Sequence, residues 1–286
     1  MGQRAYRLTL PATRSSSVVF ASPHSGRAYD MAFLERSVLD PRVIRSSEDA
    51  FVDELFDAAP AMGAPLLAAL APRAFIDLNR SHDELDPALI EGVARSSHNP
   101  RISSGLGVIP RVVANGRAIY AGKITLAEAE ARIAEHWKPY HAALQALLND
   151  QIAHFGEAIL IDCHSMPHEA IEGFGPADAP RPQVVLGDRF GASASARIVD
   201  KVEAAFVAAG LRVARNAPFA GAFITQQYGR PSRGQHVIQI EIDRSLYMDE
   251  ALIRPNANFA AIKQLLAGVT ADIVEIGRRQ LPLAAE

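Results

Sequence analysis

The sequence predicts an α/β fold built around a mixed or mainly parallel β-sheet. Short apolar runs, typical of buried strands, alternate along the chain with longer segments in which apolar residues recur at helical spacing. This alternation is the pattern of βαβ units, in which a helix links one strand to the next. The expected strands cover residues 18–21, 65–70, 75–78, 158–162, 184–186, 211–214 and 237–242.

Four of the intervening segments are expected to be helices, and their ends carry recognisable signals. Ser46 is expected to cap the first helix, and a Thr125-x-x-Glu128 capping box opens the second. Pro139 should kink or split the second helix, because proline lacks a backbone N–H and its ring clashes with the preceding turn. Gly210 is a typical stop after the third helix. The helices are expected over residues 49–59, 126–149, 193–209 and 257–279.

Two long segments do not fit regular secondary structure. Residues 85–123 are rich in Ser, Gly, Pro and Arg, and residues 216–235 contain five Gly or Pro residues. Long irregular segments inside a compact fold often form binding loops or lids. Because no internal repeat, low-complexity tract or linker is visible, we expect residues 1–286 to form a single catalytic domain.

The composition argues against several classes of function. Apolar residues make up 49% of the chain, and the formal charge of −3 disfavours an extended surface for nucleic acid or anionic membranes. The N-terminal segment is too short and polar for a secretory signal, and no window approaches the roughly 18–20 apolar residues of a membrane span. Cys163 is the only cysteine, so no intramolecular disulfide can form. We therefore expect a cytoplasmic protein with no nucleic-acid or membrane partner.

Three of the expected strands deliver side chains that can bind a metal or carry protons. The first strand breaks at Pro23 and is followed by His24, a later strand is followed by His164, and Glu241 lies among isoleucines in the last strand. Ligands collect at the carboxyl ends of strands in open α/β sheets. Two histidines and a carboxylate at one edge would satisfy a catalytic zinc, which takes three protein ligands and leaves a position for water.

Each of these residues also has an ordinary structural explanation. A histidine at a strand end often makes only hydrogen bonds within a loop, although the matching placement of His24 and His164 points to a shared cause. A buried carboxylate such as Glu241 is costly unless it is paired or ligated. The alternative for Glu241 is therefore an ion pair with a buried arginine.

Asn79 and Arg80 form a second candidate site at the end of the expected strand 75–78. A planar guanidinium beside an amide is well suited to grip a substrate carboxylate with two parallel hydrogen bonds. The alternative is that Arg80 only pairs with a nearby acid. The acids within reach along the chain are Asp77, Asp83 and Asp86.

These motifs occur in an order that resembles the N-formylglutamate amidohydrolase family. The resemblance runs from about residue 18 to about residue 250, and the Asp-Leu-Asn-Arg string also resembles aspartoacylases and, more distantly, zinc carboxypeptidases. It implies a three-layer αβα fold of the phosphorylase/hydrolase-like type, with a central, mainly parallel mixed sheet. The segments that carry the resemblance are His24-Ser25-Gly26, Glu48-Asp49-Ala50-Phe51-Val52-Asp53, Phe75-Ile76-Asp77-Leu78-Asn79-Arg80, Asp162-Cys163-His164-Ser165, Gln227-Tyr228-Gly229-Arg230-Pro231, Gln239-Ile240-Glu241-Ile242 and Ser245-Leu246-Tyr247-Met248.

For the metal site, the resemblance implies that His24 and His164 are ligands. The wider superfamily often has a compact His-x-x-Glu motif, but here Arg27 stands three residues after His24. The family pattern places an aspartate further along, and Asp49 is the best match, with helix capping as its alternative role. The choice stays open between Asp49 and two acids close to it, Glu48 and Asp53.

For the reaction, the resemblance implies that Glu241 is the general base and that Arg73 stabilises the transition state. Asn79 and Arg80 would bind the α-carboxylate of the amino acid. A second substrate carboxylate would need a further cation from the irregular segments. The candidates for that cation are Arg111, Arg230 and Arg233.

The function implied is that of a zinc-dependent amidohydrolase of histidine catabolism, which converts N-formyl-L-glutamate into formate and glutamate. Another divalent metal is compatible with the same ligands. The partner is thus a small acidic N-acyl amino acid. The alternatives are a deacylase of another N-acyl amino acid, a carboxypeptidase for short acidic peptides, and a metal-free ligand-binding relative that keeps the fold. The sequence does not indicate the oligomeric state.

Overall fold

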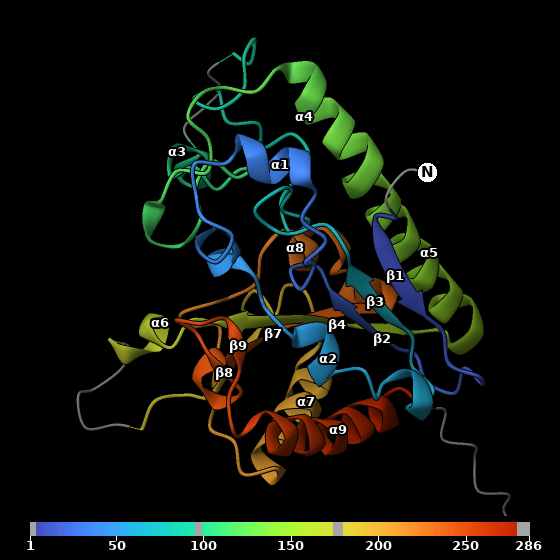
Figure 1. The fold of residues 1–286 in the computed structure, drawn as a ribbon. Helices are drawn as coiled ribbons and strands as arrows, with labels where there is room; N and C mark the ends of the chain where they lie inside the picture. Colours follow the sequence, from blue (N-terminus) through green and yellow to red (C-terminus); the bar gives the residue numbers. More distant parts are fainter. Residues whose placement is uncertain (1–3, 95–98, 174–179, 279–286) are drawn as a thin grey trace, which may run out of the picture.

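A central β-sheet organises the computed structural model, which describes residues 4–94, 99–173 and 180–278. Its seven strands lie in the order β1-β3-β2-β4-β7-β5-β6 (Figure 1). They span Tyr6–Thr9 (β1), Val18–Ser22 (β2), Leu66–Ala69 (β3), Ala158–Met166 (β4), Val184–Gly187 (β5), Val213–Arg215 (β6) and Gln235–Asp243 (β7). A separate small pair is formed by Met248–Asp249 (β8) and Arg254–Pro255 (β9).

The middle of the sheet is parallel. Strands β3, β2, β4 and β7 run in the same direction, while β1 and β5 pair antiparallel at either side of this group. The longest strands, β4 and β7, pair along nine residues, from Ala158 opposite Gln235 to Met166 opposite Asp243. The predicted mainly parallel mixed sheet is therefore confirmed, and the carboxyl ends of β2, β4 and β7 lie at one edge.

Helices cover both faces of the sheet, as the three-layer prediction requires. In Figure 1, α4 and α5 lie above the sheet, and α7 and α9 lie below it. The α-helices span Met31–Arg36 (α1), Val52–Leu55 (α2), Pro100–Ser103 (α3), Leu126–Arg132 (α4), Lys138–Phe155 (α5), Glu169–Glu172 (α6), Ala196–Ala208 (α7), Phe223–Tyr228 (α8) and Phe259–Ile276 (α9). None of the helices in the described part of the chain is long and apolar enough to cross a membrane.

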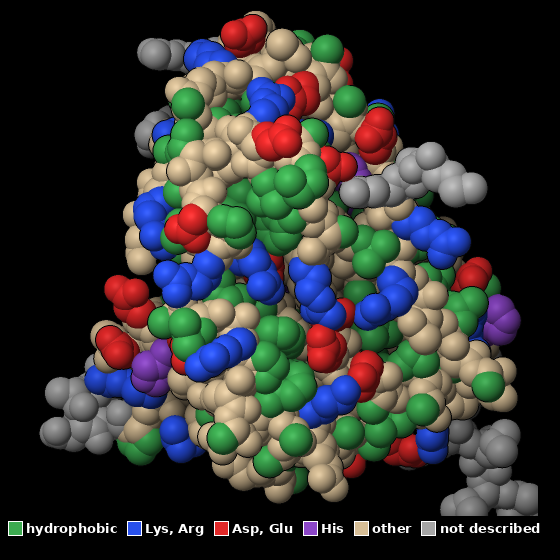
Figure 2. Space-filling view, in the orientation of Figure 1, with side chains coloured by type: hydrophobic (Ala, Val, Ile, Leu, Met, Phe, Trp, Pro, Cys, Tyr) green, Lys and Arg blue, Asp and Glu red, His purple; other side chains and the backbone are tan. Residues whose placement is uncertain are grey.

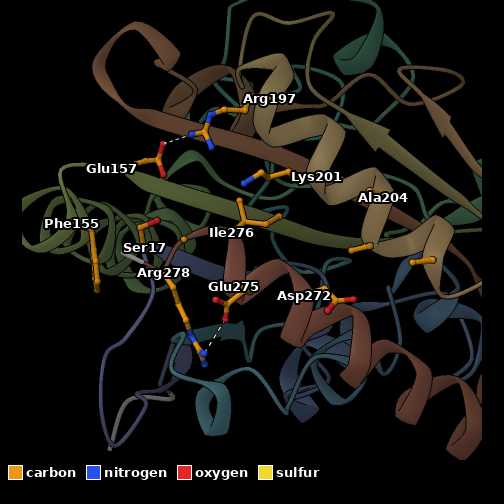
Figure 3. A pocket seen from close by; sticks show the side chains of 13 residues that line it. Ser17, Phe155, Glu157, Arg197, Lys201, Ala204, Asp272, Glu275, Ile276 and Arg278 are labelled. Atoms are coloured by element: carbon orange, nitrogen blue, oxygen red, sulfur yellow. Dashed lines mark hydrogen bonds and ion pairs between the residues drawn. The ribbon is translucent and has the colours of Figure 1, made fainter. Parts of the chain in front are cut away.

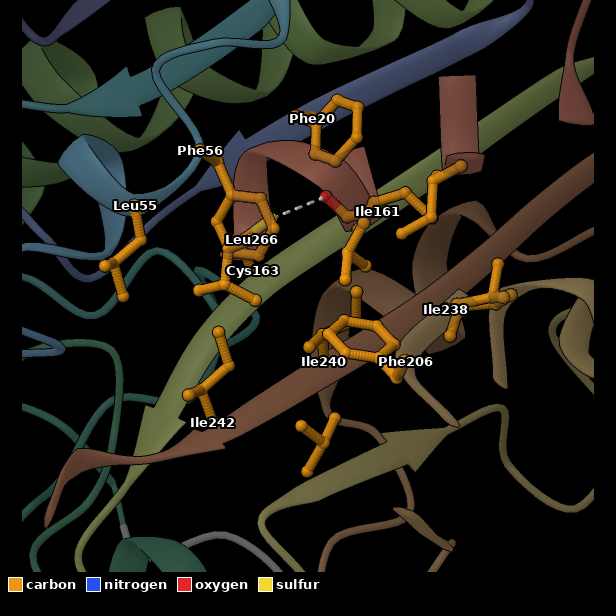
Figure 4. Close-up of a cluster of buried hydrophobic side chains, with 14 of the residues drawn as sticks. Phe20, Leu55, Phe56, Ile161, Cys163, Phe206, Ile238, Ile240, Ile242 and Leu266 are labelled. Carbon is orange, nitrogen blue, oxygen red and sulfur yellow. Dashed lines mark hydrogen bonds between the residues drawn. The ribbon is translucent and has the colours of Figure 1, made fainter. Parts of the chain in front are cut away.

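The two faces of β4 and β7 differ along their length. On the lower face, side chains such as Ile161, Cys163, Ile240 and Ile242 form one apolar core with α2, α7 and α9 (Figure 4). On the upper face, the amino-terminal halves carry Ala158, Leu160 and Val237, which belong to the apolar core under α4 and α5, but the carboxyl-terminal halves are polar. The polar residues of that half are Asp162, His164, Gln239, Glu241 and Asp243. Because side chains alternate between the two faces along a strand, the lower face of β4 and β7 can pack in the hydrophobic core while the upper face carries the polar residues of a functional site.

One predicted strand is wrong. Residues 75–78 form turns, in which the backbone N–H groups of Phe75 and Ile76 both donate to Pro72 O. Ile76 and Leu78 are nonetheless fully buried in the upper core. The apolar residues of segment 75–78 therefore indicated that the segment is buried, and not that its backbone is extended. The other six expected strands are present. Their ends differ from the expected ones by at most four residues, and the largest difference is at the carboxyl end of β4, which was expected at residue 162 and lies at residue 166.

The first predicted helix is much shorter than expected. Only Val52–Leu55 is α-helical in the expected range 49–59, and Phe51 precedes it with a left-handed φ of 67°. Ser46 does not cap this helix; it lies in a 3-10 turn, and its Oγ has no hydrogen-bond partner among the described residues. The last two helices are confirmed, although the predicted end of the final one at Arg279 lies outside the described residues.

The predicted break near Pro139 is confirmed. A π-helix, Ile133–Trp137, joins α4 to α5, and Pro139 lies in the first turn of α5. The N–H of Lys138 still donates to Ile133 O in the π-helical turn, and Pro139, which has no N–H, comes directly after it. The chain therefore stays helical from α4 to α5, but the wider π-helical turn shifts the direction in which the side chains of α5 point relative to those of α4.

Candidate active site

A cavity of about 710 Å³ opens at the carboxyl ends of β2, β4 and β7. Parts of both irregular segments, residues 104–116 and 218–222, close its sides. Seven of the ten residues singled out in the sequence line it, although they come from five separate parts of the chain. They are His24, Asp49, Arg73, Asn79, Arg80, His164 and Glu241.

The two histidines are held in matching ways. His24 Nδ1 lies 3.4 Å from Asp49 Oδ2, and His24 Nε2 lies 2.7 Å from Asp77 Oδ1. His164 Nδ1 lies 2.8 Å from Asp49 Oδ2, and His164 Nε2 lies 3.1 Å from Asp162 Oδ2. Each ring therefore turns Nδ1 toward Asp49 and rests Nε2 against a second carboxylate, an arrangement that fixes ring orientation and tautomer at metal sites.

Local backbone structure brings His24 and Asp49 together. The chain leaves β2 at Ser22, and the backbone N–H of Asp49 donates to His24 O at 3.0 Å. Gly26 follows because the loop passes directly over Ala71, where an added Cβ would lie 2.1 Å from Ala71 O. His164, in contrast, needs only the alternation of β4 to face the cavity.

The group of His24, Asp49 and His164 could hold a metal ion. All three side chains are buried, and one ligand atom from each lies within 4.8 Å of the others. His24 Nδ1 has no hydrogen-bond partner among the described residues, as expected of a nitrogen that awaits a ligand. Two imidazoles and one carboxylate also form a typical donor set for a catalytic metal.

The other two candidate acids are engaged elsewhere. Glu48 accepts hydrogen bonds from Nε and Nη2 of Arg45, both at 3.0 Å. Asp53 accepts one from Arg7 Nη2 at 2.9 Å. Figure 2 shows that Lys and Arg side chains gather in a band between α1 and α2 on the face that it displays. Of the three acids, Asp49 is the one that faces the histidines.

The charges around Asp49 keep it ionised. Burial raises the pKa of Asp49, but the hydrogen bond from His164 and the charges of both histidines outweigh burial and hold the pKa well below its usual value. Burial likewise raises the pKa of Asp77, and the charges of His24 and Arg73 hold it well below its usual value. Both carboxylates are therefore anionic at neutral pH, as a ligand and its supporting group must be.

Glu241 lies beside His164 on the neighbouring strand and is poised for proton exchange. Burial raises the pKa of Glu241 to about 7. Its Oε1 accepts a hydrogen bond from Gln239 Nε2 at 2.8 Å, and Gln239 is itself fixed by the N–H of Ala222 at 3.0 Å. Among the described residues, no Lys or Arg nitrogen lies within 4.0 Å of the Glu241 carboxylate, so the alternative of a close buried ion pair is not observed.

Arg73, Asn79 and Arg80 also line the cavity, and each is held by hydrogen bonds to neighbouring groups. Arg73 Nε donates to Asp77 Oδ2 at 3.1 Å. Asn79 Oδ1 accepts from the N–H of Ile224 at 2.7 Å, which fixes the amide. Arg80 is buried, and its Nε donates to Leu106 O at 3.0 Å. Trp137 Nε1, at the end of the π-helix, donates to Arg80 O at 2.9 Å and so anchors this segment from above.

Comparison with known proteins shows which family the chain belongs to. The family model for N-formylglutamate amidohydrolase matches residues 16–248. The chain belongs to the N-formylglutamate amidohydrolase family. N-formylglutamate deformylase of Pseudomonas aeruginosa is 30% identical over 90% of this chain and 91% of that protein, and the Pseudomonas putida protein of the same name is 29% identical over 82% of each chain.

Solved structures agree with this assignment. The crystal structure of N-formylglutamate amidohydrolase from Ralstonia eutropha superposes with a TM-score of 0.89 and 37% identity, over 96% of this chain and 99% of that one. A protein from Agrobacterium tumefaciens shares the fold at a TM-score of 0.67 and 16% identity. The resemblance seen in the sequence motifs is therefore confirmed.

Three arginines predicted to bind a second carboxylate do not line the cavity of this family member. Arg111 Nε donates to Asp86 Oδ2 at 2.8 Å, and Arg111 is not among the residues that line the cavity. Arg230 is exposed, and its Nη1 donates to carbonyl groups at the end of α8. Arg233 is exposed on a 3-10 turn. Their places depend on the path of irregular segments, which the local sequence does not specify.

Other cavity residues were missed. Gln239 lines the cavity, and Asp162 lies behind it against His164 Nε2. They stand two positions before Glu241 and His164 on the same strand faces, so strand alternation could have identified both. Arg244 had no comparable signal. Its Nη2 donates to Asp49 Oδ1 at 2.9 Å across 195 positions of sequence. Arg101, from α3, also lines the cavity.

Proposed function

We propose that this chain is a zinc-dependent amidohydrolase that cleaves N-formyl-L-glutamate into formate and glutamate. The observation that carries the proposal is the buried group of His24, Asp49 and His164 beside Glu241 in one cavity. The names of the Pseudomonas and Ralstonia relatives support the substrate. A hydrolase needs a polarised carbonyl and a group that moves the proton of water, and the cavity offers residues for both.

The three metal-facing side chains suit zinc, because three N and O donors leave a fourth position for water. Both histidines would bind through Nδ1, since Asp77 and Asp162 accept the hydrogens of their Nε2 atoms. Zinc, when bound, supplies a Lewis acid for the formyl oxygen and a water whose pKa is lowered to about 7. Another divalent metal would use the same three side chains.

Glu241 would accept a proton from the attacking water and return it to the departing amine. A pKa of about 7 suits both steps, because the group then gains and loses a proton readily near neutral pH. Gln239 donates to Oε1 and so holds the carboxylate in one orientation. As the water oxygen bonds to the formyl carbon, the C–N bond breaks, and the proton from Glu241 completes the amino group of glutamate.

Arg80 and Asn79 would bind the α-carboxylate of the substrate. Arg80 Nε is occupied by Leu106 O, which leaves the terminal nitrogens for the substrate. Asn79 Nδ2 lies 3.4 Å from Asp162 Oδ2 and 3.1 Å from His164 Nε2, so the amide is held beside the histidine. Arg73, held by Asp77, would stabilise the oxygen that becomes negative in the transition state.

An assay of zinc-loaded and chelator-treated protein tests the proposal. The substrates are N-formyl-, N-acetyl- and N-succinyl-glutamate and the corresponding aspartates, with acid and free amine both quantified. We expect zinc-dependent release of formate from N-formyl-glutamate in preference to the others. Preference for another acyl group would identify a different deacylase, and cleavage of acidic dipeptides would identify a carboxypeptidase. Tight substrate binding without turnover or bound metal would indicate a binding protein.

A further inference from the structure

Four arginines line the cavity, and two of them are already neutralised. Among the described lining residues, the cationic side chains other than histidine are Arg73, Arg80, Arg101 and Arg244. Arg73 pairs with Asp77 at 3.1 Å, and Arg244 pairs with Asp49 at 2.9 Å. These two guanidinium groups therefore hold the protein's own carboxylates in place.

Arg80 and Arg101 are different, because neither has a carboxylate oxygen within 4.0 Å in the described part of the chain. Burial lowers the pKa of Arg80, and the nearby positive charge of Arg101 lowers it further, although Asp77 partly compensates. Two like charges face one cavity without a close acidic partner. Arg101 is exposed to solvent, so the cost falls mainly on the buried Arg80, and a bound anion relieves it.

The backbone of Arg101 and the guanidinium of Arg80 are tied to the same residue, Leu106. The N–H of Leu106 donates to Arg101 O at 2.8 Å, and Leu106 O accepts from Arg80 Nε at 3.0 Å. Arg111 supports the same turn, because its N–H donates to Gly105 O at 2.8 Å and its Nη2 donates to Ser103 O at 3.3 Å. The loop that carries Arg101 is thus tied to the residue proposed to bind the α-carboxylate.

We infer that Arg101 binds the side-chain carboxylate of the substrate and makes the site selective for acidic N-formyl amino acids. The inference rests on the proposed function, in which Arg80 and Asn79 take the α-carboxylate. A substrate with two carboxylates then neutralises both unpaired guanidinium groups at once. A neutral side chain satisfies only Arg80 and leaves the charge of Arg101 without an anion.

Steady-state kinetics of Arg101→Gln on two substrates tests the inference. N-formyl-glutamate and N-formyl-glutamine have nearly the same shape and differ in the charge that Arg101 would recognise. We expect kcat/KM for N-formyl-glutamate to fall about 10- to 100-fold, mainly through KM, because an interaction made in both ground state and transition state is lost. The value for N-formyl-glutamine should change less than about 3-fold, since that substrate makes no ion pair with Arg101.

Arg233→Gln is the matched control, because it removes an exposed arginine of the other irregular segment that does not line the cavity. It should leave both substrates unaffected. Equal losses on both substrates in Arg101→Gln, or no loss on either, would overturn the inference while leaving the proposed function intact. If wild-type protein hydrolyses neither substrate, the proposed function itself is wrong, and the inference falls with it.

Discussion

The two ends of the central strands each carry a cavity, and the two cavities are nearly equal in size. The candidate active site at the carboxyl ends measures about 710 Å³, and a groove between α7 and α9, next to the amino ends of β2 and β4, measures about 680 Å³. In the groove, the charged groups are exposed or partly exposed, and four of them form two ion pairs, Glu157 with Arg197 and Glu275 with Arg278 (Figure 3).

The active-site cavity holds charges of another kind. Asp49, His164 and Glu241 are buried, and their pKa values are displaced by burial and by one another. Burying charged groups is costly, so such a cluster persists where it serves a function. Size therefore does not distinguish a site from a surface groove, whereas the electrostatic state of the lining residues does.

Replacing either histidine of the candidate metal group, His24 or His164, should have the largest effect. Wild-type protein should bind about one zinc per chain, and His24→Ala or His164→Ala should lose most of the metal and fall to background activity, because two ligands hold zinc poorly. Elemental analysis after dialysis measures this. His154→Ala, an exposed histidine at the end of α5, should keep its metal and activity. Wild-type zinc content in His164→Ala would contradict the proposed site.

Glu241→Gln should have the next largest effect. The amide cannot relay a proton, so kcat should fall about 100- to 10,000-fold while zinc stays bound. Glu157→Gln is the corresponding change in the groove, and kcat should stay unchanged there. Loss of zinc from Glu241→Gln, with full activity per remaining metal, would make Glu241 a ligand and remove Asp49 from that role.

Arg80→Lys should lower kcat/KM for N-formyl-glutamate about 10- to 1000-fold, corresponding to about 1.4–4 kcal/mol of lost transition-state contact. An ammonium cannot make the two parallel hydrogen bonds of a guanidinium. Zinc content should be normal, and a substrate with an amidated α-carboxylate should be affected far less. Equal losses on both substrates with a lower Tm would mean that Arg80 only stabilises the fold.

Arg197→Ala in the groove should have the smallest effect. Its ion pair with Glu157 is largely exposed, so the free energy of unfolding should change by only about 0.2–1 kcal/mol. Chemical denaturation measures this, and kcat/KM should not change. A marked loss of activity would show that the groove contributes to function and would break the contrast between the two cavities.

Much of the fold follows from patterns that act over a few residues. Strands β4 and β7 are recognisable because each is a short apolar run, and His164 and Glu241 face the cavity through simple alternation along those strands. The error at residues 75–78 has a physical cause, since apolar side chains report burial, and a turn can be as buried as a strand.

The parts of the site that sequence patterns missed depend on long-range placement. Arg101 and Arg111 lie in the same irregular segment, yet one lines the cavity and the other pairs with Asp86. Nothing local distinguishes them, because the path of the segment is set by contacts such as that between Arg80 and Leu106 O. Arg244 follows β7 directly, and its contact with Asp49 spans 195 positions of sequence.

The π-helix between α4 and α5 limits which changes of chain length the protein can accept. In genetic terms, a π-helical turn is an α-helix with one residue inserted. Deletion of a single codon within Ile133–Trp137 would restore the α-helix and rotate its two halves by about 100° and about 1.5 Å relative to each other. Trp137 would then lose its hydrogen bond to Arg80 O, although no substrate-facing residue had been changed. We therefore expect selection to tolerate insertions and deletions in the surface loops far more readily than in this helix.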